Sequence, residues 1–350
     1  MRSKLVGKIF ASTSDKTAQK SHTITQHDSH KKSHLRRLVV GSLLSIGFSL
    51  AAPSLVSAAD APARILLKVA DQKGGIRAQL ESAGELKNLP YDIKWSEFPA
   101  AAPLLEALNA GAVDIGFAGD APLIFALAAG APLKAIGVNK TDPYGTAIIA
   151  NADSPLSGAA SLKGKRIATG RGSIGHYLVL ASLASVGLKT SDVSFKFLSP
   201  VDAKAALSGN SVDAWATWEP YTALAEKTEH AKIVVNGRGL SAGLSYLIAH
   251  ESAIKDKRAA LQDFLQRLAR AQRWSNEHVD AFAATLSELI GVPKEVAKLS
   301  WERRQGKWVP IDDIVIKTQQ HTADVYTEAG IIPRKIDVSV SFDRSFPLQK

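Results

Sequence analysis

Residues 163–221 decide the fold of this chain. The stretch opens with KGKRIAT (163–169), continues through the glycine-rich turn GRGSIGH (170–176), and then shows the long apolar pattern typical of a helix. It closes on VDAWATWEPY (212–221). A strand that enters a helix through a glycine turn directs backbone N–H groups and the positive end of the helix dipole at one point. The pattern therefore predicts a place for an anion at this turn.

Short apolar runs alternate with helical patterns on both sides of that stretch, which predicts βαβ units and mainly parallel sheets. We expect strands at residues 64–70, 91–95, 113–117, 133–138, 146–150, 166–169, 193–197, 212–217, 233–235 and 246–249, with a late strand at 335–341. We expect helices at residues 77–85, 102–110, 122–129, 175–186, 203–207, 220–227, 258–276, 279–290, 293–301 and 311–329.

One motif occurs twice. Residues 106–114 (EALNAGAVD) and 204–213 (KAALSGNSVD) each read as a helix, a glycine cap and a strand led by Val-Asp. The repeat predicts two α/β lobes, with residues 60–147 and 250–350 in the first and residues 148–249 in the second. Crossings near residues 146–150 and 246–250 would place a ligand cleft at the junction, where ligands often bind.

Charge and cysteine content exclude several classes of protein. The net charge is +10, but residues 1–59 hold nine of the 43 Lys and Arg residues and only two of the 33 acids. The rest of the chain has a net charge of about +3, which is too small to indicate a nucleic-acid-binding surface. The sequence has no cysteine, so disulfides, thiolate catalysis, Cys-ligated metals and a lipid-modified cysteine are excluded.

The first 59 residues have the features of an export signal. A polar, basic lead precedes Arg36 and Arg37, an apolar run spans 38–52, and small residues follow at 56–59 (VSAA). This order predicts cleavage after Ala58 or Ala59 and a periplasmic protein. An uncleaved anchor is the alternative, and the Arg pair also allows twin-arginine export. The histidines of the lead fit a targeting sequence better than a metal site.

The glycine turn matches two catalytic patterns only in part. GRGSIG has the spacing of a dinucleotide fingerprint, but the next strand lacks the terminal acid that would hold a ribose. Ser173 and His176 could form a nucleophile and base, yet Arg171 stands where a nucleophile elbow needs glycine. The interpretation of residues 170–176 as a purely structural turn is a further alternative. We expect Ser173 to cap the helix and donate, and His176 to face a ligand or cap the helix.

Further candidates lie elsewhere in the chain. Gly119 and Asp120 open a second turn into a helix, which is either an anion-facing terminus or an ordinary capped helix. Gln72 and Lys73 follow the first strand and add an amide and a cation.

The end of the deciding stretch is aromatic and acidic. Trp215 and Trp218 are either core residues or a wall for an apolar group. Glu219 would repel an anion unless it is paired, which favours a hinge or orienting role over direct contact.

Together these residues resemble the periplasmic aliphatic sulfonate-binding proteins of ABC importers. The resemblance covers nearly the whole mature chain and is carried by Phe98-Pro99, residues 104–116 (LLEALNAGAVDIG), 119–122 (GDAP) and 128–132 (AAGAP), Gly172-Ser173 with His176, Asp202-Ala203, residues 212–215 (VDAW), 218–220 (WEP), 322–324 (TAD) and 333–338 (PRKIDV).

The resemblance implies a type II periplasmic binding fold, with two α/β lobes that close around a ligand on two hinge strands. It implies a monomeric, non-enzymatic receptor that needs no cofactor and delivers a sulfonate to an inner-membrane permease. Taurine, nitrate, a sulfate ester or a thiamine precursor are alternative ligands, and an exported hydrolase is the remote alternative. The residues it places at the ligand are Gln72, Gly119, Asp120, Gly172, Ser173, His176, Trp215 and Trp218. Lys73 and Glu219 join this set of candidates as neighbouring charged residues.

The sequence departs from the family pattern at four positions. Ala118 replaces a frequent hydroxyl residue, and Gly175 replaces a hydroxyl or Asn. Glu219 stands for the usual aspartate, and Asp71 for a frequent aromatic. Two missing donors put the standard alkanesulfonate in doubt, and Arg171 could compensate by its charge.

Overall fold

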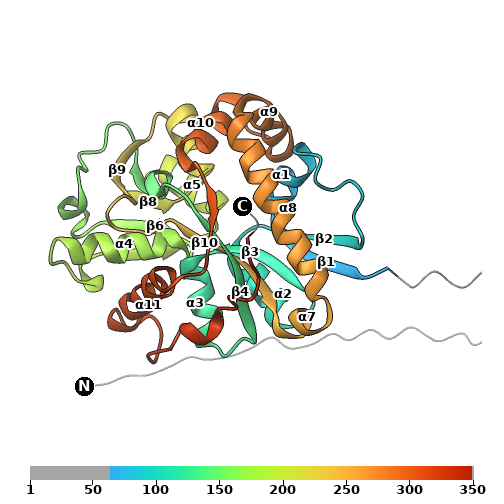
Figure 1. The fold of residues 1–350 in the computed structure, drawn as a ribbon. Coiled ribbons are helices and arrows are strands. Elements are labelled where there is room, and N and C mark those ends of the chain that lie inside the picture. Colours follow the sequence, from blue (N-terminus) through green and yellow to red (C-terminus); the bar gives the residue numbers. More distant parts are fainter. Residues whose placement is uncertain (1–63, 349–350) are drawn as a thin grey trace, which may run out of the picture. The chain divides into compact units, whose positions relative to one another are not determined.

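Two β-sheets organise residues 64–348, which are the residues that the computed structural model describes (Figure 1). The first sheet has the strand order β11-β4-β10-β3-β1-β2. Strands β1 and β3 run parallel to each other, as do β1 and β2, whereas β10 is antiparallel to β3 and β4. Its strands are β1 (Leu66–Gln72), β2 (Asp92–Phe98), β3 (Ile115–Gly119), β4 (Leu133–Lys140), β10 (Leu244–His250) and β11 (Lys307–Val309).

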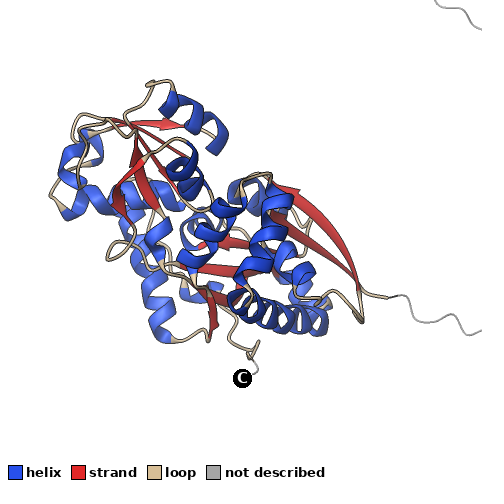
Figure 2. Ribbon diagram, turned by 90° about the horizontal axis from the view of Figure 1, so that it is seen from above, coloured by secondary structure: helices blue, strands red, loops and turns tan. Residues whose placement is uncertain are grey.

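The second sheet has the order β7-β6-β8-β5-β9. Strands β6, β7 and β8 are parallel, and β5 is antiparallel to both β8 and β9. Its strands are β5 (Ala147–Ala150), β6 (Arg166–Thr169), β7 (Ser194–Phe197), β8 (Ala214–Thr217) and β9 (Lys232–Asn236). Figure 2 shows the strands gathered in two groups, each with helices beside it. We call each sheet with the helices packed on it a lobe, the first and the second.

Helices cover both faces of each sheet. In the first lobe, Phe264 and Leu265 of α8 pack on Leu67 and Val69 of β1. On the other face, apolar side chains of α2 and α3 form a second cluster with β3, β4 and β10. The helices are α1 (Ile76–Ser82), α2 (Ala101–Asn109), α3 (Asp120–Ala128), α4 (Ile174–Ser185), α5 (Pro200–Ser208), α6 (Tyr221–Thr228), α7 (Glu251–Asp256), α8 (Arg258–Glu277), α9 (Val279–Ile290), α10 (Lys294–Arg304) and α11 (Asp313–Glu328).

The repeated Val-Asp motif has the same structural use in both lobes. Asp114 Oδ2 accepts a hydrogen bond from Lys68 N at 2.6 Å, and Asp213 Oδ2 accepts one from Arg166 N at 2.7 Å. Each carboxylate thus satisfies a backbone donor near the start of a neighbouring parallel strand. The paired cations differ, because Lys257 contacts Asp114 whereas the side chain of Arg166 itself contacts Asp213.

The chain path differs from the sequence predictions at three points. The chain crosses between the sheets at residues 141–146 and 237–243, since β5 and β10 lie wholly inside their sheets. The expected late strand at 335–341 is wrong: the segment holds only a 3₁₀ turn, Ser339–Ser341, and Val338 is buried against α3, α4 and α11. The short strand β11 was not predicted, because three residues show no recognisable alternation.

The sequence predictions about the export signal and the lobe boundaries are not tested by the structure. The predicted signal at residues 1–59 lies outside the described residues, and the lobe boundaries remain a prediction. In the described part, residues 64–348, no helix has the length and apolar character needed to cross a membrane.

Candidate functional site

The candidate site residues follow strands that end at one edge of each sheet. The parallel register of β1 and β3 puts Gln72 and Gly119 at the same edge of the first sheet. In the second sheet, β6 and β8 likewise end side by side at Thr169 and Thr217. The carboxyl edge of parallel strands is where ligands bind in open α/β sheets.

Elements of the first lobe reach the glycine turn of the second. A Cβ atom at Gly172, which has a φ of 70°, would lie 2.9 Å from the ring of Phe125 on α3. The hydroxyl of Tyr326 on α11 donates to the carbonyl oxygen of Ser173 at 3.2 Å. Figure 1 shows α11 (red) beside α3 and near α4. The predicted anion turn therefore faces the junction between the lobes.

Ser173 caps helix α4, as the sequence predicts. Its Oγ accepts from His176 N at 3.2 Å and lies 3.3 Å from Thr169 Oγ1. The backbone N–H of Gly172 donates to His176 Nδ1 at 3.2 Å. The imidazole is thus held against the turn by the backbone, and Ser173 is held by the helix rather than by the imidazole.

His176 presents a buried donor. Its side chain is 0% exposed, with the rings of Phe195 and Phe197 at 5.0 and 5.2 Å. Burial, and then the charge of Arg171, lowers its pKa to about 4, so the ring is neutral at pH 7. Because Nδ1 accepts a hydrogen bond, Nε2 carries the hydrogen. Among the described residues Nε2 is buried and has no hydrogen-bond partner.

Asp120 opens α3 with a buried carboxyl group. The residue is 1% exposed, and Oδ1 accepts from Ala121 N at 2.7 Å. Burial raises the pKa of Asp120 to about 7, against the opposing effect of backbone N–H groups. Three buried tyrosines interact electrostatically with it: Tyr177, Tyr246 and Tyr326. Its side chain belongs to this internal cluster, so any ligand contact at this turn would come from the backbone.

The end of β1 and the residue that follows it provide one structural acid and two candidate contacts. Asp71 caps α1 by accepting from the N–H groups of Ile76 and Arg77, and burial raises its pKa to about 7. This explains an acid at a position where the family often has an aromatic. Gln72 donates from Nε2 to Phe117 O at 3.3 Å, and Lys73 is exposed.

The two tryptophans of the deciding stretch are in different environments. Trp215 is 2% exposed and packs with Leu207 and Ala225 in the core between the second sheet and its helices. This burial favours the core interpretation of Trp215 over the ligand wall that the sequence also allowed. Trp218 is partly exposed and packs at 6.0 Å, edge to face, on Tyr221. Of the two tryptophans, only Trp218 has exposed surface with which it could line a ligand site.

The carboxylate of Glu219 is hydrogen-bonded and ion-paired to other groups of the protein. It is 7% exposed, its Oε2 accepts from Ala223 N at 2.9 Å, and its Oε1 lies 3.3 Å from Arg303 of α10. These contacts fit the hinge or orienting role that the sequence favoured over direct ligand contact.

Gly175 allows α4 to pack on β8, and replacing it with serine should destabilise the protein. A Cβ atom at Gly175 would lie 2.5 Å from Ala216 O and 2.9 Å from Thr169 Oγ1. The missing polar side chain, interpreted from the sequence as a lost donor, is thus a packing requirement. We expect Gly175→Ser to lower the free energy of unfolding by about 1–3 kcal/mol through overpacking, measured by urea denaturation.

The matched control for that substitution is Ala184→Ser on the exposed side of the same helix. It should change stability by no more than about 0.5 kcal/mol. Equal stability of Gly175→Ser and the parent protein would show that the helix can shift on the strand.

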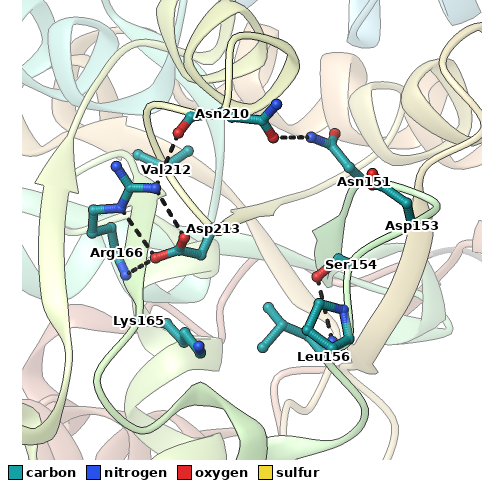
Figure 3. A pocket seen from close by; sticks show the side chains of 10 residues that line it. Asn151, Asp153, Ser154, Leu156, Lys165, Arg166, Asn210, Val212 and Asp213 are labelled. Carbon is teal, nitrogen blue, oxygen red and sulfur yellow. Dashed lines mark hydrogen bonds and ion pairs between the residues drawn. The ribbon is translucent and has the colours of Figure 1, made fainter.

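Two surface pockets lie away from these residues. One, of about 240 Å³, is lined by Lys165, Arg166, Asn210 and Asp213 near the starts of β6 and β8, at the opposite edge of the second sheet. Figure 3 shows Arg166 bonded to Asp213 and Asn151 bonded to Asn210 at this pocket. The other, of about 510 Å³, lies between the crossing segments. Neither pocket is lined by a predicted ligand residue.

Comparison with known proteins agrees with this fold. A family model described as NMT1/THI5 like matches residues 93–281. A putative aliphatic sulfonates-binding protein of Escherichia coli (strain K12) is 34% identical over 307 residues, which is 86% of this chain and 94% of that protein. The chain belongs to the aliphatic sulfonate-binding protein family.

Solved structures of aliphatic sulfonate-binding proteins have the same fold. The alkanesulfonate-binding protein from Xanthomonas axonopodis pv. citri, bound to MOPS, aligns with a TM-score of 0.75 at 33% identity over 81% of this chain and 100% of that one. The periplasmic aliphatic sulphonate binding protein from Escherichia coli aligns with a TM-score of 0.74 at 33% identity, over 81% and 94% of the two chains. The predicted type II periplasmic binding fold is confirmed.

An enzyme also shares the fold. A desulfurization enzyme aligns with a TM-score of 0.57 at 16% identity, covering 81% of this chain and 97% of that one. That likeness concerns the fold alone, because folds host unrelated functions.

Sequence reasoning missed three residues that contact the candidate site. Phe125 and Tyr326 contact the glycine turn, and Arg303 contacts Glu219. Phe125 and Tyr326 sit in helices whose apolar patterns read as ordinary core. Only Arg303 gave a signal, as a buried cation would be the partner that Glu219 needs.

Proposed function

We propose that the protein is an exported, non-enzymatic receptor that binds an aliphatic sulfonate and delivers it to the permease of an ABC importer. The unpartnered Nε2 of the buried, neutral His176 carries this proposal. An N–H donor buried without a partner is costly, and a sulfonate oxygen would satisfy it. The names of the relatives support the ligand class and the periplasmic location.

The remaining groups have roles that follow from their positions. The first turns of α3 and α4 offer the positive ends of two helix dipoles to the anionic head. Ser173 and Gln72 supply further donors, and Lys73 a nearby cation. Trp218 and Tyr221 pack the organic tail, because they are the aromatic pair at the end of β8 that is partly exposed. Closure of the lobes on the crossing segments then forms the surface that the permease recognises.

The geometry speaks against the hydrolase alternative. A general base must lie within hydrogen-bond reach of the nucleophile. His176 Nδ1 is bonded to Gly172 N, Nε2 has no partner among the described residues, and Ser173 Oγ accepts from a backbone N–H. Ser173 thus acts as a helix cap without an adjacent base.

A thermal-shift panel tests the ligand class. The purified protein, in a buffer without sulfonates, is heated with C1–C8 alkanesulfonates, MOPS, taurine, nitrate, methyl sulfate and a pyrimidine. A ligand at about 1,000 times its Kd adds roughly 4 kcal/mol, which at about 2–4 °C per kcal/mol raises Tm by roughly 8–16 °C. We expect this shift with at least one alkanesulfonate.

Two further measurements complete the test. His176→Leu lacks the Nε2 donor and should bind the same sulfonate about 10- to 100-fold more weakly, as expected for loss of a hydrogen bond to a charged group. The bound sulfonate should be recovered unchanged. A shift with nitrate or the pyrimidine but with no sulfonate would replace the proposed ligand, and turnover that Ser173→Ala abolishes would replace the receptor with an enzyme.

A further inference from the structure

Arg303 joins the two lobes at a point remote from the glycine turn. We propose that Arg303 is a positioning residue that holds Glu219, and with it residues 218–221, against the first lobe in the closed arrangement. The inference goes beyond the proposed function and does not depend on which solute is bound.

Helix α10, which carries Arg303, is part of the first lobe. Its residues Ala297 and Trp301 pack with Phe282 of α9 and Ala78 of α1. The indole Nε1 of Trp301 also donates to Ser275 O of α8 at 3.0 Å. The helix is therefore fixed to the elements that cover the first sheet.

The partners of Arg303 belong to the second lobe. Its Nη1 lies 3.3 Å from Glu219 Oε1, just after β8, and also contacts Glu226 Oε2 on α6. The side chains of Arg303 and Glu219 are only 17% and 3% exposed. The neighbouring Arg304 also interacts electrostatically with Glu219. A cation of one lobe thus lies between two carboxylates of the other.

The first crossing segment is enclosed by this group of charges. The ring of Tyr144 lies under the guanidinium groups of Arg303, at 5.2 Å, and Arg238, at 4.8 Å. At Gly145 a Cβ atom would lie 2.4 Å from Glu219 Cγ. Thr222 Oγ1 donates to Gly145 O at 2.8 Å. The ion pair therefore lies directly beside residues 141–146, the first of the two segments about which the lobes would rotate.

The energetics favour one arrangement over the other. Burial raises the pKa of Glu219, while the N–H of Ala223 and the charge of Arg303 lower it. A buried charge that keeps its partner is tolerated, but one that loses it is strongly disfavoured. Opening the lobes would hydrate both ions. Without Arg303, Glu219 would be buried and unpaired in the closed arrangement but hydrated in the open one, so the loss of Arg303 would disfavour closure. In the closed arrangement the pair also fixes the segment that carries Trp218.

Distance measurements between the lobes test the proposal. The chain has no cysteine, so Lys94→Cys and Lys196→Cys introduce two unique sites for spin labels. Both residues are exposed, on the edge strands β2 and β7 farthest from the crossing segments. Electron–electron resonance on the ligand-free, doubly labelled protein then reports the closed-to-open ratio as a distribution of distances.

We expect Arg303→Met to lower the closed-to-open ratio by about tenfold or more, because it leaves Glu219 buried and unpaired. Glu226→Gln should shift the distances in the same direction by less. Adding Glu219→Gln to Arg303→Met should restore part of the shorter distances, since the uncompensated charge is then gone. A contact that only stabilised the fold would show no such rescue.

The matched control is Lys298→Met on the same helix, because Lys298 pairs with Asp280 inside the first lobe. Its distances should equal those of the parent protein. Unchanged distances in both Arg303→Met and Glu226→Gln, or an equal change in Lys298→Met, would overturn the proposal. A wrong ligand class would appear in the thermal-shift panel and leave these distances as expected.

Discussion

Replacing Trp215 with alanine should lower the free energy of unfolding by about 3–5 kcal/mol, the range for removing a buried tryptophan. The side chain is 2% exposed and packs in one cluster with Leu207 and Ala225. Its removal therefore leaves a cavity between the second sheet and its helices. Urea denaturation, followed by far-UV circular dichroism, measures the loss.

Trp218→Ala separates this structural role from a ligand role. Trp218 is partly exposed and contacts Tyr221 at the end of β8, so its removal should cost less stability than that of Trp215. It should instead weaken binding of the sulfonate found in the thermal-shift panel, as measured by calorimetry. If Trp215→Ala were as stable as the parent protein, the assignment of Trp215 to the core would be wrong.

Replacing Asp120 with asparagine should stabilise the protein at pH 8 and have little effect at pH 4. Burial raises the pKa of Asp120 from its ordinary value of 3.8 to about 7 in the folded protein. Between these values the folded state binds the additional proton, so the stability that Asp120 contributes falls as pH rises. The difference corresponds to about 4 kcal/mol. Asparagine is neutral throughout and can still accept from Ala121 N.

Urea denaturation at pH 4, 6 and 8 measures this effect, with Asp213→Asn as a control of opposite sign. The hydrogen bond from the Arg166 side chain lowers the pKa of Asp213, so Asp213 contributes stability above its unfolded pKa. Asp213→Asn should therefore lose stability at pH 8 relative to pH 4. A constant difference between Asp120→Asn and the parent protein at all three pH values would contradict the proposed ionisation of Asp120.

The buried acid also bears on anion binding. A carboxylate at the start of α3 would ordinarily repel a sulfonate held at the same helix terminus. Because burial raises the pKa of Asp120 to about 7, much of that negative charge is absent at neutral pH. The helix terminus can then attract an anion despite the acid in its first turn.

Local patterns in the sequence predicted most of the fold. The apolar run at residues 166–169 coincides with β6, and the helix expected at residues 279–290 coincides with α9. Ser173 was predicted as a helix cap, and the structure confirms it. These features depend on alternation, helical periodicity and capping within a few residues, so a single chain segment contains the information.

The structural roles of particular side chains could not be predicted from such local patterns. Trp215 and Trp218 look alike in sequence, and burial alone distinguishes them. Gly175 read as a missing donor, whereas the backbone of β8, about 40 residues later, explains it. In both cases the contact that decides the role of the residue lies in another segment of the chain.

The sequence by itself determined an α/β fold of mainly parallel strands, a glycine turn between a strand and a helix, and the cap of that helix, because each rests on backbone geometry and short-range periodicity. Only the tertiary structure decided how the lobes meet at that turn. Phe125 and Tyr326 reach Gly172 and Ser173 from the other lobe, and Arg303 reaches Glu219 across 84 residues. Such contacts depend on burial and on the packing of distant elements, and no local pattern encodes them.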